Sequence, residues 1–402
     1  MSQIELPVGL STWSIDPGAA QFIRGQRHKE PTALRDPVAV LRESLEHPLR
    51  FEALRRVFTP DDHVTIVVDD RLPSVSQLLI PILEHLDSAR IQMENVTLLT
   101  LPPGTRQGWI DELPDAFQDV RTEIHDPQNP QRMAYLATTK VGSRLYMNRT
   151  LVEADQLLVL TGRGYDPLLE YSGSEALLYP GFSNQEIRNS FAKQFSAETP
   201  GEGTWPIHAE AVEVAWLLGT PFLVQVIEGY GDSVSAVISG LLNTSKDAQQ
   251  ALDERWKVKV REPVDTVIVT LSGDPSRLEF SDLAHAALAG SRIVAPGGRV
   301  VILSDLELHL DEAGEMMRGF EEPHEALRAL KKSNLGGMGG AFQWASAAQR
   351  AKLTVAAHSH WEVIEEIFAT PMQKPGEVSR LLESTKSFTT LIDGHKSLAV
   401  IG

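Results

Sequence analysis

The sequence lacks the features that would place it in a membrane, in the secretory pathway or among thiol enzymes. None of its 402 residues is a cysteine, which excludes disulfides, iron–sulfur clusters, thiolate zinc sites and cysteine nucleophiles. There is no apolar run of about eighteen residues that could span a membrane. The N-terminus, MSQIELPVGLSTWSIDPG, has no basic start followed by an apolar core. We therefore expect a cytoplasmic protein without a membrane partner.

Positive charge is also scarce. The chain has 54 acidic residues against 37 lysines and arginines, which gives a net charge of −17. Nucleic-acid binding needs a clustered basic surface, so we expect no nucleic-acid partner. A small anionic ligand needs only one or two well-placed arginines, and such a partner stays open. The length and the hydrophobic content of 42% are those of a globular protein with room for two domains.

The first part of the chain alternates between two kinds of pattern. Short apolar runs typical of buried strands occur at residues 63–70, 96–101, 156–160 and 222–227. Apolar residues recur at helical spacing over residues 76–86 and 208–218. This strand–helix alternation predicts an α/β protein with a mostly parallel sheet covered by helices.

A second series begins after Arg261-Glu262-Pro263. Its strand patterns lie at residues 265–272, 298–304, 353–357 and 397–401, and a helix pattern covers residues 280–293. We therefore predict two Rossmann-like α/β domains, residues 1–262 and 263–402. Their mostly parallel sheets should leave a ligand cleft between the domains.

The segment 161–181, TGRGYDPLLEYSGSEALLYPG, is the most informative stretch of the chain. It follows a strand-like run, so its turns lie at the carboxyl end of a sheet, where α/β proteins bind ligands. It resembles the signature of the nickel-pincer-nucleotide-dependent lactate racemase family, a His followed by G-F-S-G-G-x-K and P-G. Ser172-Gly173 and Pro180-Gly181 match that pattern. The family's His falls on Asp166. Its Lys, which the resemblance implies would bond covalently to the cofactor, falls on Ala176.

Two strand ends extend the resemblance. The Asp of the family motif D-x-T-R-P-T-P falls on Asp69 and its Arg on Leu72, with Arg71 one residue earlier, where it can still face an anion. Arg106 replaces the His of the family's T-G-x-H-R loop. An arginine stays protonated and cannot act as a base, but it can hold a carboxylate or phosphate. The resemblance implies that the cofactor or ligand contacts Asp69, Arg71, Arg106, Ser172 and Gly173. The alternative for Asp69 and Arg71 is a solvated turn capped at Ser74 or Ser76. For Arg106 it is an ordinary surface arginine.

In the second half, Asp282 and His285 replace the Gln and Lys of the family motif Y-Q-A-x-K, which face the substrate. Three residues apart, they lie on one helix face. Together they can form a general base with its orienting carboxylate, or simply a surface pair. Asp166 can take a proton if burial raises its pKa.

The residues that would anchor the family cofactor are changed. The resemblance implies a nickel-ligating His near Ser190 or Ala192, yet no His occurs between His125 and His208. We expect His208 to be structural. With Ala176 in place of the Lys, we predict no covalent nickel-pincer nucleotide and no metal site, and we leave the cofactor open. The His358-Ser359-His360 doublet is more typical of solvated imidazoles than of a metal site. The glycine-rich run 336–340 either approaches a ligand or forms a flexible loop.

The resemblance spans the chain from about Leu45 to the last strand and implies racemisation or epimerisation of small 2-hydroxy acids. Because the reactive positions differ, two hypotheses follow. In the first, the protein is a divergent isomerase with altered cofactor dependence, whose catalytic residues are Asp166, Asp282 and His285. In the second, it is a non-catalytic relative that binds a small anion, a nucleotide or another protein. The sequence leaves the oligomeric state open.

Overall fold

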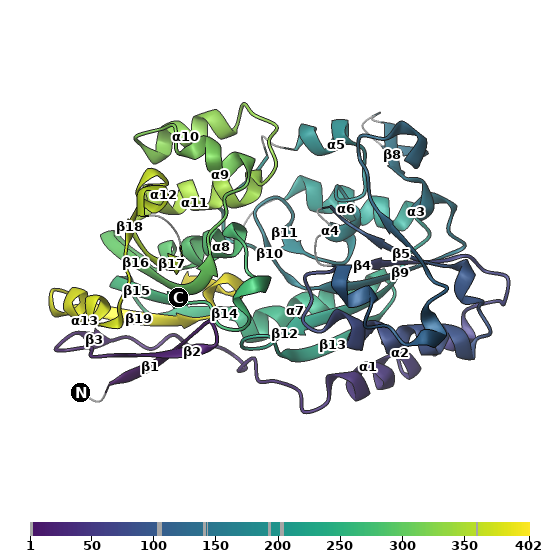
Figure 1. Cartoon of the computed structure of the whole chain (residues 1–402), viewed down its shortest axis with the longest axis horizontal. Helices are drawn as coiled ribbons and strands as arrows, with labels where there is room; N and C mark the ends of the chain where they lie inside the picture. The colour runs from purple at the N-terminus through teal and green to yellow at the C-terminus, as the bar shows by residue number, and fades with distance from the viewer. Residues whose placement is uncertain are drawn as a thin grey trace.

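The computed structural model describes residues 3–102, 107–139, 142, 144–191, 194–201, 205–358 and 361–402. Over these residues the chain builds two six-stranded sheets, one in each half of the molecule (Figure 1). The first sheet runs, in spatial order, β13 (Val234–Gly240), β12 (Phe222–Glu228), β9 (Gln156–Gly162), β4 (Val64–Val68), β5 (Val96–Thr100) and β6 (Arg121–Ile124). All neighbours are parallel except β12 and β13.

The second sheet is parallel throughout. Its spatial order is β18 (Ala369–Pro371), β17 (Lys352–His358), β16 (Val294–Glu307), β15 (Val264–Thr270), β19 (Ser387–Ile392) and β3 (Gln21–Phe22). The prediction of an α/β fold with mostly parallel sheets is therefore confirmed. The five residues of β4 are all buried, as expected of a strand with helices on both faces of its sheet.

Helices cover both sheets. The first half carries α1 (Pro37–Glu46), α2 (Val75–Ser88), α3 (Arg149–Glu153), α4 (Glu175–Leu178), α5 (Gln185–Ser190), α6 (Pro206–Leu217) and α7 (Ser245–Trp256). The second half carries α8 (Phe280–Ser291), α9 (Glu312–Met317), α10 (Pro323–Leu330), α11 (Met338–Arg350), α12 (Trp361–Glu366) and α13 (Pro375–Glu383). None of the helices in the described ranges is long and apolar enough to cross a membrane.

Two-stranded sheets complete the fold. They pair β1 (Ile4–Val8) with β2 (Ser11–Ile15), β7 (Met133–Thr138) with β8 (Arg144–Asn148), β10 (Gly164–Asp166) with β11 (Glu170–Ser172), and β14 (Lys257–Val260) with β20 (Leu398–Ile401). The N-terminal hairpin β1–β2 packs on the second half, where Leu6 and Val8 join a core with Ile268 and Val301. Residues 4–22, which we had assigned to the N-terminal domain, thus belong to the second core. The division near residue 262 otherwise stays a prediction.

The order of connections creates one reversal point in each sheet. After β4, the chain adds β5 and β6 on one side and then returns to add β9 and β12 on the other. After β15, it adds β16, β17 and β18 on one side and then β19 on the other. In doubly wound sheets, ligands bind at the carboxyl ends of the strands beside such a reversal. Asp69 and Ser272, just beyond β4 and β15, line the same cavity.

Candidate functional site

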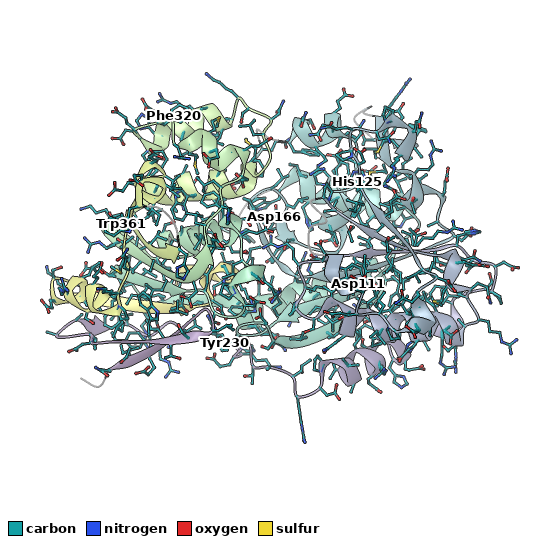
Figure 2. All side chains as sticks on the ribbon, viewed as in Figure 1. Asp111, His125, Asp166, Tyr230, Phe320 and Trp361 are labelled. Carbon is teal, nitrogen blue, oxygen red and sulfur yellow. The ribbon has the colours of Figure 1, made fainter. Side chains whose placement is uncertain are left out.

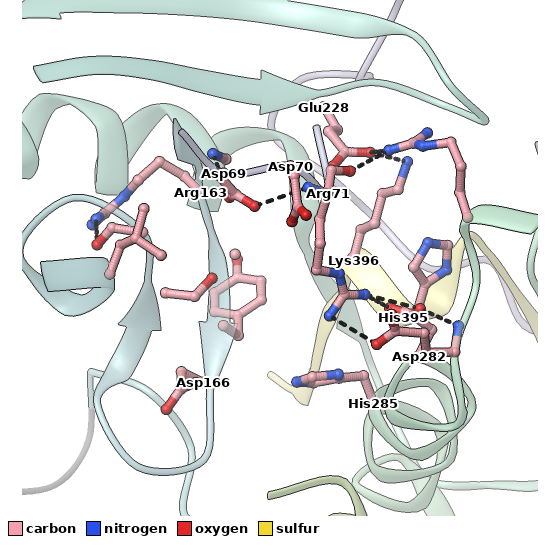
Figure 3. Close-up of a pocket in the computed structure, with 18 of the residues that line it drawn as sticks. Asp69, Asp70, Arg71, Arg163, Asp166, Glu228, Asp282, His285, His395 and Lys396 are labelled. Atoms are coloured by element: carbon pink, nitrogen blue, oxygen red, sulfur yellow. Dashed lines mark hydrogen bonds and ion pairs between the residues drawn. The ribbon is translucent and has the colours of Figure 1, made fainter. Parts of the chain in front are cut away.

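A cavity of about 510 Å³ lies where the two reversal points face each other (Figure 3). Seven of the eight residues predicted from the sequence line it: Asp69, Arg71, Asp166, Ser172, Gly173, Asp282 and His285. The eighth, Arg106, lies outside the described residues. The cavity draws its walls from both halves of the molecule, so the chain brings together side chains more than 200 residues apart.

Asp69 ties the ends of β4 and β9 together. Its Oδ2 accepts a hydrogen bond from the backbone N–H of Gly162 at 3.1 Å, and its Oδ1 accepts one from the N–H of Arg71 at 3.2 Å. Burial raises the pKa of the Asp69 carboxyl, and these hydrogen bonds offset only part of that rise. Asp69 therefore fixes the backbone around the cavity while presenting a carboxyl that holds its proton more tightly than usual.

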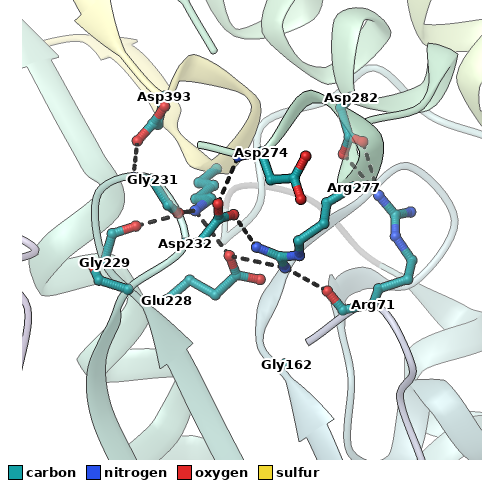
Figure 4. Close-up of polar contacts among 12 residues, drawn as sticks. Arg71, Gly162, Glu228, Gly229, Gly231, Asp232, Asp274, Arg277, Asp282 and Asp393 are labelled. Carbon is teal, nitrogen blue, oxygen red and sulfur yellow. Dashed lines mark hydrogen bonds and ion pairs between the residues drawn. The ribbon is translucent and has the colours of Figure 1, made fainter. Parts of the chain in front are cut away.

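Arg71 reaches across the cavity to Asp282. Its Nη2 donates to both carboxylate oxygens of Asp282, at 2.9 and 3.0 Å, and its Nη1 lies 3.8 Å from Glu279 Oε2 (Figures 3 and 4). Asp282 also caps α8, because its Oδ2 accepts the N–H of Glu279 at 2.8 Å. Burial is the largest single influence on the pKa of Asp282 and would raise it. The positive charge of Arg71, two nearby histidines and the N–H of Glu279 together outweigh burial and lower the pKa to about 2.

This ion pair changes two expectations from the sequence. The guanidinium of Arg71, which we expected to face a ligand anion, is occupied by the carboxylate of Asp282. A carboxylate with a pKa of about 2 is a weak base at neutral pH, so Asp282 is poorly suited to accept a proton. Both residues line the cavity, but their contacts give them a structural role that joins the two halves.

His285 is held by the backbone of its own helix. Its Nδ1 lies 2.8 Å from the carbonyl oxygen of Ser281, which can only accept, so Nδ1 carries the proton. The other nitrogen, Nε2, is buried and has no hydrogen-bond partner among the described residues. Burial lowers the pKa of His285, against the pull of the nearby carboxylates of Asp282 and Asp166. The orienting group is thus the Ser281 carbonyl, rather than Asp282, which was one of the two interpretations of this pair.

Asp166 faces His285 from the other half of the molecule. It ends β10, and its Oδ1 accepts the N–H groups of Leu168 at 2.7 Å and Leu169 at 2.8 Å. Burial raises its pKa, and these hydrogen bonds and the nearby His285 only partly oppose the rise. Figure 2 shows Asp166 between the two halves. An acid with a raised pKa and a base with a lowered one therefore share a single cavity.

The chain leaves the β10–β11 hairpin through a turn that depends on a glycine. Gly173 has a φ of +80°, and a Cβ atom there would lie 2.0 Å from the carbonyl oxygen of Gly162. Its own carbonyl oxygen accepts a hydrogen bond from Arg163 Nη1 at 2.9 Å. These contacts place the start of α4 against the cavity, where Ala176, 7% exposed, contributes only a methyl group. The position that matches the family's lysine thus faces the site without an amine.

The sequence analysis did not predict a further group of charged residues that line the cavity. Lys396 Nζ lies 2.8 Å from Glu228 Oε2 (Figure 3). It also donates to the carbonyl oxygens of Gly231 at 2.6 Å and Gly229 at 3.1 Å. Arg277 pairs with Asp232 and donates to the carbonyl oxygen of Arg71 at 2.6 Å. No local pattern distinguishes these residues. Recognising β19 as a strand would have drawn attention to Lys396, four residues beyond its end.

His395 lies beside this group and also lines the cavity. Burial and the neighbouring Lys396 lower its pKa to about 4, against the opposing pull of carboxylates such as Asp393. Over the described ranges, no group of three or more His, Cys, Asp or Glu residues is arranged to hold a metal ion. Of the two histidines in the predicted doublet, His358 is described and lines a different cavity, while His360 lies outside the described residues.

The structure defines a two-sheet α/β protein with a cavity lined by both of its halves, and known proteins share this fold. Residues 9–199 match the model of the lactate racemase N-terminal domain. The lactate racemase of Thermoanaerobacterium thermosaccharolyticum is 22% identical over 414 aligned residues, covering 96% of this chain and 95% of that protein. The structure of the lactate racemase apoprotein from that organism matches with a TM-score of 0.81 at 20% identity. The match covers 99% of this chain and all of the other.

A crystal structure of a protein from Thermotoga maritima is a more distant match. It has a TM-score of 0.68 at 11% identity, over 91% of this chain and 98% of that one. Together with the near full-length match to lactate racemase, these comparisons show that residues 9–199 match the lactate racemase N-terminal domain and that the whole chain shares the fold of lactate racemase. The resemblance inferred from the sequence is confirmed.

Proposed function

We propose that this protein is an isomerase that racemises or epimerises a small 2-hydroxy acid. The observation that carries the proposal is the pairing of Asp166 and His285 in one cavity. They come from different halves of the chain, and their pKa values move in opposite directions. Inversion at a carbon needs a group that takes up hydrogen on one face and a group that returns it on the other. The family supports the same class of reaction.

In this proposal, each of the two residues has a proton-transfer role. His285 carries its proton on Nδ1, so the free electron pair on Nε2 can take the proton from the hydroxyl-bearing carbon. The electron pair of the broken C–H bond stays on the substrate as an enediolate. Asp166, whose raised pKa favours the protonated form, returns a proton to the opposite face. The reverse direction exchanges the two roles, and the reaction leaves the oxidation state unchanged.

The nickel-pincer nucleotide that the family resemblance suggests does not fit the residues present. At the position of the anchoring lysine, Ala176 offers a methyl group, which cannot form a covalent link. The carboxylates that line the cavity suit a hard cation better than nickel. We therefore derive no step through that group and propose a cofactor dependence that differs from the family's.

Isotope exchange tests the proposal. Purified protein would be incubated in D₂O with single enantiomers of several 2-hydroxy acids, starting with lactate. Loss of optical activity with deuterium entering at C2 is expected, because the proton taken by one residue exchanges with solvent. Asp166→Asn and His285→Gln should each lower the rate about 100-fold or more. Asp115→Asn and His309→Gln, which lie outside the cavity, should leave it unchanged.

Two outcomes would redirect the proposal. Inversion without deuterium at C2 would show that hydrogen moves as a hydride, so the roles given to Asp166 and His285 would be wrong. If folded protein binds 2-hydroxy acids or nucleotides but inverts none of them, the alternative of a non-catalytic anion-binding relative would replace the isomerase.

A further inference from the structure

A second cavity of about 620 Å³ adjoins the first, and no function has yet been assigned to it. It shares Arg71, Asp166 and His285 with the first cavity. Beyond them it runs between α5 in one half and the start of α11 in the other. A substrate whose reacting carbon lies between Asp166 and His285 therefore has room here for the rest of its structure. Lactate, with only a methyl group beyond that carbon, would leave this space largely unused.

The cationic side chains around the two cavities differ in whether a protein group compensates their charge. Among the described residues, Arg71, Arg277 and Lys396 each contact a carboxylate, and Arg163 donates to a backbone carbonyl. Arg188, on α5, is half-buried in the wall of the second cavity, and no acidic group or carbonyl within the described ranges contacts its guanidinium. Burial is the one influence on its pKa, which it lowers. A half-buried positive charge without a compensating anion is costly, and a ligand anion would remove that cost.

Other polar groups that line the second cavity also lack hydrogen-bond partners among the described residues. Gln343, on α11, is only 3% exposed, yet its Oε1 accepts no hydrogen bond from the described residues. The hydroxyl of Ser281, on α8, is likewise buried without a partner. Both residues line the second cavity. Buried polar groups are normally satisfied, so unsatisfied ones beside a cavity indicate a ligand that supplies the missing hydrogen bonds.

The glycine-rich turn 336–340 forms the rim of this cavity. α11 begins after Gly337, whose φ of +79° and lack of a side-chain cap leave the first backbone N–H groups of the helix without a capping oxygen. Glu312 also lines the rim, and its Oε2 accepts the N–H of Gly336 at 3.0 Å. This carboxylate would repel an anion placed at the turn. An anionic group is therefore best accommodated on the opposite wall, at Arg188.

We propose that the second cavity is a substrate subsite for a second anionic group, with Arg188 as its anchor and with Gln343 and Ser281 hydrogen-bonding to the substrate. The substrate would be a 2-hydroxy acid that carries a further carboxylate or phosphate. This inference rests on the proposed isomerase function for the reacting end of the molecule. The contact between Arg188 and the second anionic group of the substrate can be tested by binding alone.

Calorimetric titration of the full chain with three probes tests the subsite. Lactate has no second anionic group, malate has a carboxylate, and 3-phosphoglycerate has a phosphate. Malate or 3-phosphoglycerate should bind at least about tenfold more tightly than lactate, and the stronger of the two identifies the anion. Arg188→Gln should remove that preference, and Arg188→Lys should keep part of it. Arg42→Gln on α1, which removes an exposed pair with Glu84 on α2, should preserve the preference.

The outcomes separate this inference from the proposed function. Equal affinity for the three probes, or a preference that survives in a folded Arg188→Gln protein, would overturn the subsite even if lactate is racemised. An Arg188-dependent preference without any isomerisation would support the subsite while the proposed reaction fails. Melting temperatures of the variants verify that each one is folded.

Discussion

The guanidinium of Arg71 and the carboxylate of Asp282 join the two halves of the molecule across its main cavity, with both carboxylate oxygens within 3.0 Å of a single nitrogen. Arg71 follows the central strand β4 of the first sheet, and Asp282 stands in the first turn of α8 beside the second. The pair therefore connects the two structural centres directly. Its geometry makes it both a stabilising contact and a constraint on what can enter the cavity.

Replacing Asp282 should lower stability in a pH-dependent way. The pKa of Asp282 in the folded protein, about 2, is below the value of about 4 for an unfolded chain. Its stabilising contribution is thus complete above about pH 4 and is lost as the pH falls through about 2. Asp282→Asn should lower the free energy of unfolding at pH 7 by about 1–2 kcal/mol, discounted for the partial exposure of Arg71.

Urea unfolding at pH 7 and pH 3 would measure this effect, with Arg71→Gln and the double variant completing a mutant cycle. The two substitutions should be coupled by about 1 kcal/mol or more. Additive effects would show that the pair contributes nothing as a pair.

His395 should make the protein lose stability in mild acid. Above about pH 6.5 its side chain is neutral in both the folded and unfolded chains. Between about pH 6.5 and pH 4, His395 is protonated in the unfolded chain but stays neutral in the folded protein, because its pKa in the folded protein is about 4. Stability therefore falls with pH in this window, by about 2 kcal/mol between pH 7 and pH 5. His395→Gln should lose correspondingly less over the same interval.

The exposed His309 provides the matched control, since His309→Gln should follow the wild-type pH dependence. Chemical denaturation at half-unit steps from pH 7 to pH 5 would resolve the difference. A His395→Gln protein with an unchanged slope would place the origin of the acid sensitivity elsewhere.

Gly173→Ala should be far more disruptive than an alanine at another left-handed glycine. At Gly173, the added Cβ would lie 2.0 Å from the carbonyl oxygen of Gly162, so the hairpin must move. At Gly219 the φ is +92°, but nothing lies within 4 Å of the added atom. We expect a loss of about 3 kcal/mol or more for Gly173→Ala and about 1 kcal/mol for Gly219→Ala. Thermal unfolding of the two variants compares them directly, and equal losses would contradict the close approach.

Lys396→Met should destabilise the contact between the halves. The side chains of Lys396 and Glu228 are mostly buried, so removing the ammonium leaves Glu228 with the more distant Arg277, 4.0 Å away. A loss of about 3 kcal/mol is expected from breaking a buried pair. The control Lys352→Met replaces an exposed lysine at the start of β17 and should change stability by less than about 0.5 kcal/mol. Urea midpoints that match for the two variants would argue against the pair.

Four strands of the first sheet, β4, β5, β9 and β12, were predictable because burial produces continuous apolar runs, whereas β6 and β13 were not expected from the sequence. The strand expected at residues 63–70 is β4, and the one expected at residues 222–227 is β12. The strand β19, SFTTLI, was missed, since two threonines and a serine weaken its apolar pattern. Its absence from the prediction also hid the reversal point of the second sheet and the residues just beyond it.

The positions of the site residues were more predictable than their partners. Asp69, Asp166 and Asp282 line one cavity, as expected from their places at strand ends and on α8. The sequence could not show that Asp282 binds Arg71, because that contact joins residues 211 apart and depends on how the halves pack. The same applies to His285, whose orienting group is a backbone carbonyl, which no residue pattern records.

The placement of the N-terminal hairpin on the second core has a consequence for synthesis. Residues 4–22 leave the ribosome long before β15, which belongs to the sheet that receives them and begins at Val264. At a synthesis rate of about 5–20 residues per second, the surface that binds the hairpin is made roughly ten seconds or longer after the hairpin itself. During that time its apolar residues are exposed while the first sheet is already assembling. This segment is thus made early but is among the last to reach its folded position, and a nascent-chain chaperone would act during that interval.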